Sequence, residues 1–451
     1  MYTPINSRLL GLIIVMCWLT MPNILAQNEG QMDEIIKNVS KARLTKDVTT
    51  LVNFGTRHTL SDTISNVRGI GAARRYIKSE FEKISSDCGG CLDVFYQRTL
   101  VSKGSNERIF RDVWVVNVIA IQRGQSTPND YVIMSGDIDS RISDPNNHID
   151  EAPGANDNAT GMAGTLEAAR VLSHYRFEKS IVYVGLSGEE QGLFGGKGLA
   201  EYAKTHEWNI IGVLNNDMIG NTEGIDGVKD NRSFRIFSEP TPVTESEQDR
   251  KARRYFGGEV DGVSRQLARY VYKTTQKFMP EMKPIMIYRL DRFGRGGHHR
   301  PFNDAGYPGI RIMETHENYD HQHQDLRTEN GIYYGDRLEH VDFNYVTKLT
   351  TVNAINLAQL ANAPSSPNNV SISGMVAPST TLSWSEVAGA TAYRVYWRDT
   401  TNPHWQYSKL ITGTNKATLQ GIVIDNYFFG VAAVGPNGHE SVVRFPNEVK
   451  R

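Results

Sequence analysis

Two kinds of apolar spacing alternate along most of the chain. Apolar residues recur at helical spacing over residues 32–42, 46–54, 69–84, 161–172, 197–205, 262–278 and 343–361. Short apolar runs typical of buried strands cover residues 92–96, 113–121, 130–134, 181–186 and 210–215. Because these strands alternate with helices, the pattern predicts an α/β fold, a doubly wound mixed sheet flanked by helices.

The pattern changes at Ala363. Residues 363–369 are rich in Ser, Pro and Asn, which is typical of a linker. Short alternating runs follow, and they predict strands over residues 381–384, 392–398, 417–419 and 427–434. Trp384, the strand at 393–397 and Tyr427 resemble a fibronectin type III sandwich with Tyr427 at its corner position. Residues 363–451 are therefore predicted to be an all-β module, of a kind that usually spaces or binds.

The first 26 residues resemble a secretory signal peptide. Arg8 precedes an apolar stretch over residues 9–21, and Ala26 is a plausible cleavage position. About 13 apolar residues are too few to span a bilayer comfortably, so a membrane anchor is the weaker interpretation. We expect export to the periplasm or the medium, no membrane span after cleavage, and a main domain over residues 27–362.

Composition narrows the choice of partners. The net charge of -1 provides no field for nucleic acid or a membrane surface. After signal cleavage only Cys88 and Cys91 remain, without the second cysteine pair that a zinc knuckle needs. In an oxidising compartment this pair is predicted to form a disulfide across a tight loop.

Carboxylates follow the predicted strands in four polar clusters, at residues 136–140, 154–158, 187–191 and 215–218. The carboxyl ends of strands in an open α/β sheet meet at one crevice. Carboxylates crowded there raise one another's pKa, and a divalent cation is the usual means of neutralising them. The clusters therefore predict a metal site for two ions.

A metallohydrolase also needs a base that is not a ligand. Glu189 and Glu190 are adjacent, so one could bind a metal while the other accepts a proton from water. His299, after two glycines and His298, is the natural nitrogen ligand. Five of the 12 histidines fall between residues 298 and 323, which suggests the rim of the same crevice.

Five ordered motifs resemble zinc-dependent exopeptidases, the family that includes secreted bacterial leucyl aminopeptidases, glutamate carboxypeptidase-like enzymes and, as a divergent branch, glutaminyl cyclases. They are DIDS at 137–140, PGANDNATG at 153–161, SGEEQGLFG at 187–195, NDMIG at 216–220 and HRPF at 299–302. The resemblance runs from about residue 32 to residue 361. It implies an aminopeptidase in which a water shared by two metals attacks the scissile carbonyl.

The resemblance also implies individual roles. Asp157 would bridge two zinc ions, and Glu189 would be the general base. Asp139 would orient the ligand at position 137. The remaining metal ligands would be Glu190 and His299 on one ion, and Asp137 and Asp217 on the other.

Asp137 departs from the family pattern, which has His-x-Asp-Ser where this chain has Asp-x-Asp-Ser. A fourth carboxylate lowers the formal charge of a two-ion centre from about +1 to about zero. The Asp137 site should therefore prefer a harder ion, manganese or calcium, over zinc. A one-metal enzyme and a degenerate metal-binding or adhesion protein are the alternatives.

Other polar residues leave the specificity open. His298 is expected to support the ligands rather than bind metal. His316, His321 and His323 resemble the family's late Tyr-His segment near the substrate pocket. Two of Arg292, Arg295 and Arg300 could bind a substrate carboxylate, which would favour a carboxypeptidase or dipeptidase. Glutaminyl cyclisation is disfavoured, because that branch usually binds one zinc through a smaller ligand set.

Overall fold

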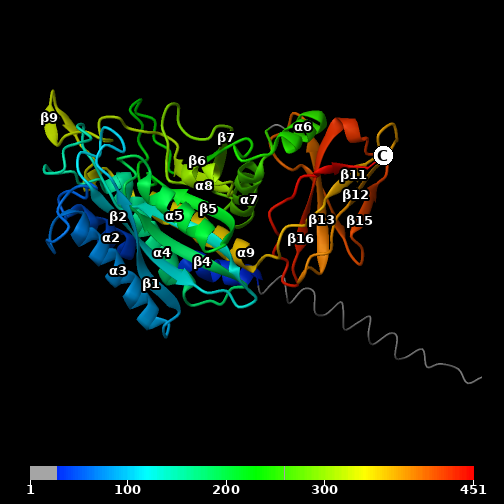
Figure 1. Cartoon of the computed structure of the whole chain (residues 1–451), viewed down its shortest axis with the longest axis horizontal. Coiled ribbons are helices and arrows are strands. Elements are labelled where there is room, and N and C mark those ends of the chain that lie inside the picture. Colours follow the sequence, from blue (N-terminus) through cyan, green and yellow to red (C-terminus); the bar gives the residue numbers. More distant parts are fainter. Residues whose placement is uncertain (1–27, 259, 451) are drawn as a thin grey trace, which may run out of the picture. The chain divides into compact units, whose positions relative to one another are not determined.

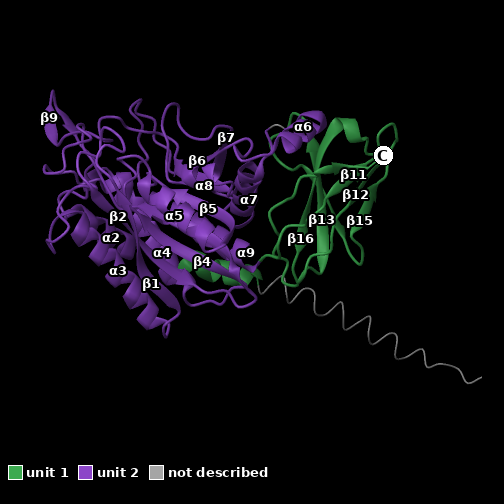
Figure 2. Cartoon of the chain, viewed as in Figure 1, with its two compact units in different colours: residues 1–37, 363–451 green, residues 38–362 purple. Residues whose placement is uncertain are grey.

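The computed structural model describes residues 28–258 and 260–450, so the predicted signal peptide lies outside the described residues. The chain divides into two compact units (Figure 2). One comprises residues 38–362. Of the described residues, the other comprises 28–37 and 363–450. Within the described ranges, no helix combines the length and apolarity that crossing a bilayer requires.

An eight-stranded mixed sheet forms the centre of the larger unit (Figure 1). Its strands are β1 (Leu92–Val101), β2 (Val113–Gln122), β3 (Thr127–Asp137), β4 (Lys179–Leu186), β5 (Asn209–Asn216), β6 (Ser233–Ser238), β7 (Lys283–Ile287) and β8 (Gly309–Glu314). Their order across the sheet is β1-β2-β4-β3-β5-β8-β6-β7. The neighbours β4, β3, β5 and β8 run parallel. Four carboxyl ends therefore meet at one edge of the sheet.

Helices cover both faces of this sheet. The helices of this unit are α2 (Lys41–Val52), α3 (Gly69–Asp87), α4 (Gly161–Leu172), α5 (Phe194–Thr205), α6 (Glu247–Phe256), α7 (Val263–Phe278), α8 (His299–Asp304) and α9 (Phe343–Asn362). Helix α6 buries none of its residues and does not contribute to this cover. Helix α9 packs on α2, α4 and α7, whereas α5 packs on α8. Leu199 of α5 and Phe302 of α8 join Ile133 and Val182 of the sheet in one buried cluster. The predicted doubly wound mixed sheet flanked by helices is confirmed.

A cap separates the first two helices. The predicted helix over residues 32–42 ends at residue 38, and α2 begins at Lys41. The Ser40 side chain accepts a hydrogen bond from the Arg43 backbone N–H at 3.3 Å, which satisfies a donor that the helix leaves free. The apolar spacing over residues 32–42 predicts one helix, but the Ser40 cap separates that segment into the end of one helix and the start of α2.

A buried carboxylate joins α2 to α3. Glu80 is 1 % exposed and lies 3.1 Å from Arg43, 3.6 Å from Lys46 and 2.6 Å from Lys83. Burial opposes its ionisation, but these cations prevail and hold the pKa of Glu80 below its ordinary value. Its contribution to stability is therefore complete above the unfolded pKa of about 4.3 and declines as the pH falls through the lower folded pKa.

We expect Glu80→Gln to lower the free energy of unfolding by about 1–3 kcal/mol at neutral pH, because hydrogen bonds to a buried charge are lost. Urea denaturation at pH 7 and at pH 3 should show the difference shrinking in acid. Glu82, whose ion pair with Lys78 is exposed, provides the control, and Glu82→Gln should change stability by less than about 0.5 kcal/mol. Equal losses in the two variants would contradict this account.

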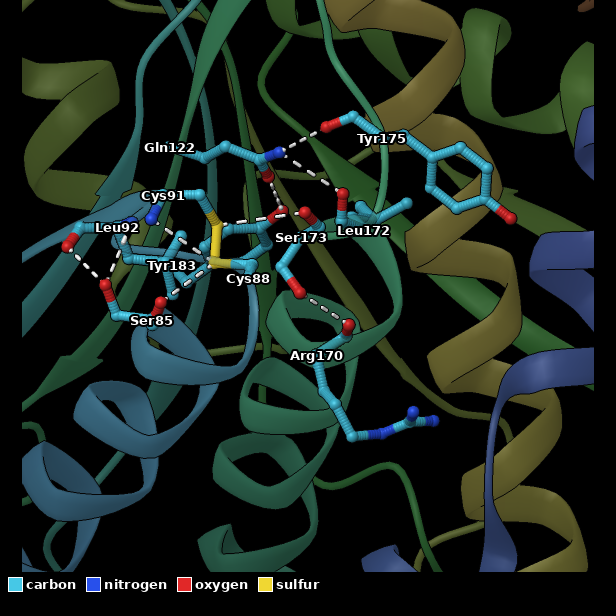
Figure 3. The surroundings of a disulfide bond; sticks show 10 residues. All are labelled: Ser85, Cys88, Cys91, Leu92, Gln122, Arg170, Leu172, Ser173, Tyr175 and Tyr183. Carbon is cyan, nitrogen blue, oxygen red and sulfur yellow. Dashed lines mark hydrogen bonds between the residues drawn. A yellow bond between two sulfur atoms is a disulfide. The ribbon is translucent and has the colours of Figure 1, made fainter.

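The predicted disulfide between Cys88 and Cys91 is present (Figure 3). It closes the turn between the end of α3 and the start of β1. Ser85 secures the same turn, because its hydroxyl donates to the Leu92 carbonyl at 2.9 Å and accepts from the Leu92 N–H at 3.1 Å. The pair is therefore structural.

The C-terminal unit contains two sheets in which most neighbouring strands are antiparallel. One has the order β15-β12-β11-β17 and the other β14-β13-β16. The strands are β11 (Ser371–Ser373), β12 (Thr380–Ser383), β13 (Ala392–Asp399), β14 (Tyr407–Ile411), β15 (Lys416–Leu419), β16 (Tyr427–Val434) and β17 (Glu448–Val449). Leu382, Trp384, Val395 and Phe429 share one buried core drawn from both sheets. This arrangement is sandwich-like, as the alternating pattern predicts.

Candidate metal centre

The parallel strands deliver acidic side chains to one edge of the sheet. Asp137 ends β3, Glu189 and Glu190 follow β4, Asp217 follows β5 directly, and Glu314 ends β8. Adjacent parallel strands pair Gly136 with Gly185, so these ends are in register. The side chains that are far apart in sequence therefore meet as the clusters predict.

Asp157 reaches this edge from the irregular helix η1 (Ala155–Thr160). Gly154, before it, has φ of +52°. A Cβ there would lie 2.5 Å from both the Asp157 carbonyl and the Ser140 Cβ, so only glycine fits. Asp336 accepts the Asp157 backbone N–H at 2.6 Å, and burial raises the pKa of Asp336 to about 7. These contacts fix the approach of the Asp157 carboxylate.

Asp157, Glu190 and His323 form a compact group of possible ligands. The His323 Nε2 atom lies 2.9 Å from Asp157 Oδ2 and 3.0 Å from Glu190 Oε1. One ligand atom from each residue falls within 4.8 Å of the others, and among the described residues no other group of three does so. Carboxylate oxygen and imidazole nitrogen are both zinc ligands, and three protein ligands leave a fourth position open, as in catalytic zinc sites.

Positive charge also surrounds this group. Arg141 donates to Glu190 Oε2 at 2.8 Å and lies 2.7 Å from His323 Nδ1. Burial disfavours the charged form of His323, but Glu190 and Asp157 outweigh it and raise its pKa to about 9. A metal ion bound here must therefore displace a proton at neutral pH.

Glu189 stands beside these residues. Burial, followed by the charges of Glu190 and Asp217, raises its pKa well above the ordinary value. Asp139 accepts the backbone N–H groups of Glu189 at 3.2 Å and Glu190 at 3.1 Å, and the Thr59 hydroxyl at 3.0 Å. Asp139 thus holds the glutamate pair, whereas the sequence suggested that it orients residue 137.

Asp137 is buried between two hydrogen-bond donors. His298 Nδ1 donates to its Oδ1 at 2.5 Å, and Asn158 Nδ2 donates to its Oδ2 at 2.8 Å. Burial lowers the pKa of His298 to about 4, so this imidazole is neutral. The expected supporting role of His298 is consistent with this contact.

Asp217 is paired with an arginine. The Arg311 NH2 group lies 2.8 Å from Asp217 Oδ2, and both side chains are almost completely buried. Arg311 also contacts Asp291 at 3.1 Å and donates to the Gly296 carbonyl at 2.8 Å. Arg311 has no role that the sequence predicts, and it lies between two apolar residues, Ile310 and Ile312, of β8.

His299 lies apart from the three-residue group. Its Nε2 is 2.8 Å from the Leu290 carbonyl oxygen and 3.6 Å from Asp291 Oδ2. The imidazole beside Asp157 and Glu190 belongs instead to His323, in the late histidine segment. The signal that could have identified it is that segment's resemblance to the family's Tyr-His motif.

The fold and this donor set define a metal-dependent hydrolase. The sequence profile described as Peptidase family M28 matches residues 117–331. A probable zinc metalloprotease of Pyrenophora tritici-repentis is 37 % identical over 93 % of this chain and 98 % of its own length. A second, from Leptosphaeria maculans, is 40 % identical over 93 % and 97 %. The chain belongs to peptidase family M28 and is a metallopeptidase.

Solved structures agree on the fold. The Legionella pneumophila LapA aminopeptidase matches with a TM-score of 0.54 and 16 % identity over 74 % of this chain and 75 % of that one. A Macrostomum lignano glutaminyl cyclase matches with a TM-score of 0.51 and 16 % identity, over 73 % and 91 %. Since both reactions occur on this fold, the fold alone does not determine the substrate.

Proposed function

We propose that this chain is an exported zinc aminopeptidase that hydrolyses amino-terminal peptide bonds. The observation that carries the proposal is the group formed by Asp157, Glu190 and His323, with Glu189 beside it. A zinc ion held by this group would act as a Lewis acid and would lower the pKa of water.

The protein's own groups perform the proton transfers. Glu189 accepts a proton from the attacking water and returns it to the leaving amine. Burial, followed by the charges of Glu190 and Asp217, raises its pKa well above that of an ordinary glutamate, so it holds a transferred proton more readily. Asp139 is a positioning residue, because its two backbone contacts fix Glu189 relative to Glu190.

Arginine contacts favour the amino-terminal reaction over the carboxy-terminal one. The Arg292 guanidinium forms an ion pair with Glu317, with NH1 2.7 Å from Oε2. Arg295 donates to the Gln322 side chain at 3.0 Å, and Arg300 contacts the Arg295 carbonyl at 3.5 Å. These contacts do not supply the pair of uncommitted guanidinium groups that a carboxylate clamp needs. The aminopeptidase activity named for the Legionella structure is consistent with this choice.

Both ends of the chain have proposed roles outside catalysis. Residues 1–26 would direct secretion or delivery to the periplasm, where the Cys88–Cys91 disulfide would form. The sandwich-like unit over residues 363–451 would be a fibronectin type III-like module that spaces or binds rather than catalyses.

Hydrolysis of aminoacyl-p-nitroanilides by the purified protein tests the reaction. We expect turnover of substrates with a free α-amino group, loss of turnover after treatment with EDTA, and recovery when zinc is added. The amino-acetylated forms of the same substrates are the matched control and should not be cleaved. Turnover of the acetylated forms would exclude an aminopeptidase, and zinc binding without hydrolysis would favour a degenerate binding protein.

A further inference from the structure

We infer that the centre holds a single catalytic ion, and that the Arg311 guanidinium supplies the positive charge that a second ion would otherwise bring to Asp217. The inference rests on the proposed function and deepens it. It concerns the two carboxylates, Asp137 and Asp217, that the sequence assigned to a second ion.

Both carboxylates are already engaged by the protein. Asp217 Oδ2 lies 2.8 Å from Arg311, and the oxygens of Asp137 accept hydrogen bonds from His298 and Asn158. Of the four oxygens, only Asp217 Oδ1 is without a hydrogen-bond or ion-pair partner. One oxygen next to a guanidinium is not a cation site, since a divalent ion needs several ligand atoms and would be repelled by the arginine.

Arg311 cannot easily make way for a metal ion. Its backbone lies in β8, where it pairs with Asn215 of β5, and its side chain is completely buried. Asp291 and the Gly296 carbonyl hold NH1 of the guanidinium, while NH2 lies beside Asp217. A histidine or lysine could lose a proton to admit a cation, but an arginine retains its charge at every accessible pH.

The contrast with the neighbouring group supports this assignment. Asp157, Glu190 and His323 present converging ligand atoms, whereas Asp137 and Asp217 belong to no such group among the residues the structure describes. Arg141 pairs with Glu190 Oε2, but Glu190 Oε1 and Asp157 Oδ2 still converge with His323 Nε2, whereas no third ligand atom of a described residue converges with the carboxylates of Asp137 and Asp217. This inference replaces the expectation of a manganese or calcium ion at Asp137.

Zinc content measures the difference directly. The purified wild-type chain would be stripped with EDTA, reloaded with excess zinc, desalted and analysed by inductively coupled plasma mass spectrometry. We expect about one zinc per chain, and the same value for Asp137→Asn and Asp217→Asn, because neither residue is a ligand. Far-UV circular dichroism would establish that each variant is folded.

Each alternative gives a different count. Two zinc ions in the wild-type chain would overturn the inference but leave the proposed function intact. Loss of the single ion in folded Asp217→Asn would also overturn it, because Asp217 would then be a ligand. Absence of bound zinc together with absence of zinc-dependent hydrolysis would overturn the proposed function itself.

Discussion

Glu189→Gln should lower kcat for aminoacyl-p-nitroanilides by about 10²- to 10⁴-fold, the range that general acid–base groups contribute. Glutamine matches the shape of glutamate but cannot accept the water proton. Since Glu189 is not in the group of ligand atoms, zinc content should not change. Steady-state kinetics and metal analysis of the same preparation measure both quantities.

Glu190→Gln is the matched control, since it makes the same substitution one residue further along. Glu190 is one of the three converging ligands, so this variant should lose zinc as well as activity. The pair of variants thus separates proton transfer from metal binding. An unchanged hydrolysis rate in zinc-loaded Glu189→Gln would refute the assignment of the base.

His323→Ala should weaken zinc binding at least about a hundredfold. Changes to the partners of metal ligands already cost about 10- to 100-fold in affinity, and loss of a ligand should cost more. His323 is expected to be a ligand because its Nε2 lies within 3.0 Å of carboxylate oxygens of both Asp157 and Glu190. Competition with a zinc-binding dye gives the affinity, and hydrolysis should fall with occupancy.

His299→Ala tests the ligand suggested by the HRPF motif. We expect its zinc affinity to equal that of the wild type, because His299 does not belong to the group of converging ligand atoms. Its free energy of unfolding should fall by about 1–3 kcal/mol, since a fully buried imidazole and its hydrogen bond to the Leu290 carbonyl are lost. Zinc loss from His299→Ala, with retention in His323→Ala, would restore His299 as the ligand.

The parts of the fold that can be predicted from the sequence are those in which no charged residue interrupts the apolar pattern. Strands β3, β4 and β5 stand out because each contains a short run of apolar residues that is buried on both faces. Strands β6, β7 and β8 were not predicted; Arg235 and Arg311 lie in the interiors of β6 and β8, and β7 has only five residues. The charge of Arg311 is tolerated there only because Asp217 and Asp291 neutralise it, and those partners are distant in sequence.

Of the candidate site, the carboxylates can be predicted from the sequence, whereas the imidazole cannot. The carboxylate clusters follow strands directly, so local pattern is enough to bring them to one edge. The imidazole comes from a loop in which His323 has φ of +55°, a conformation rarely adopted by non-glycine residues. Three histidines occur close together in that loop, and only the tertiary contacts distinguish His323 from His321.

Asp139 binds the amides of Glu189 and Glu190 from a position 50 and 51 residues earlier in the chain. One carboxylate therefore ties the end of β3 to the residues after β4. If one strand shifted along the other, the proton acceptor and a metal ligand would be displaced together. Activity would then report on the alignment of the sheet, so mutations deep in these strands could silence the enzyme while the chain stays folded.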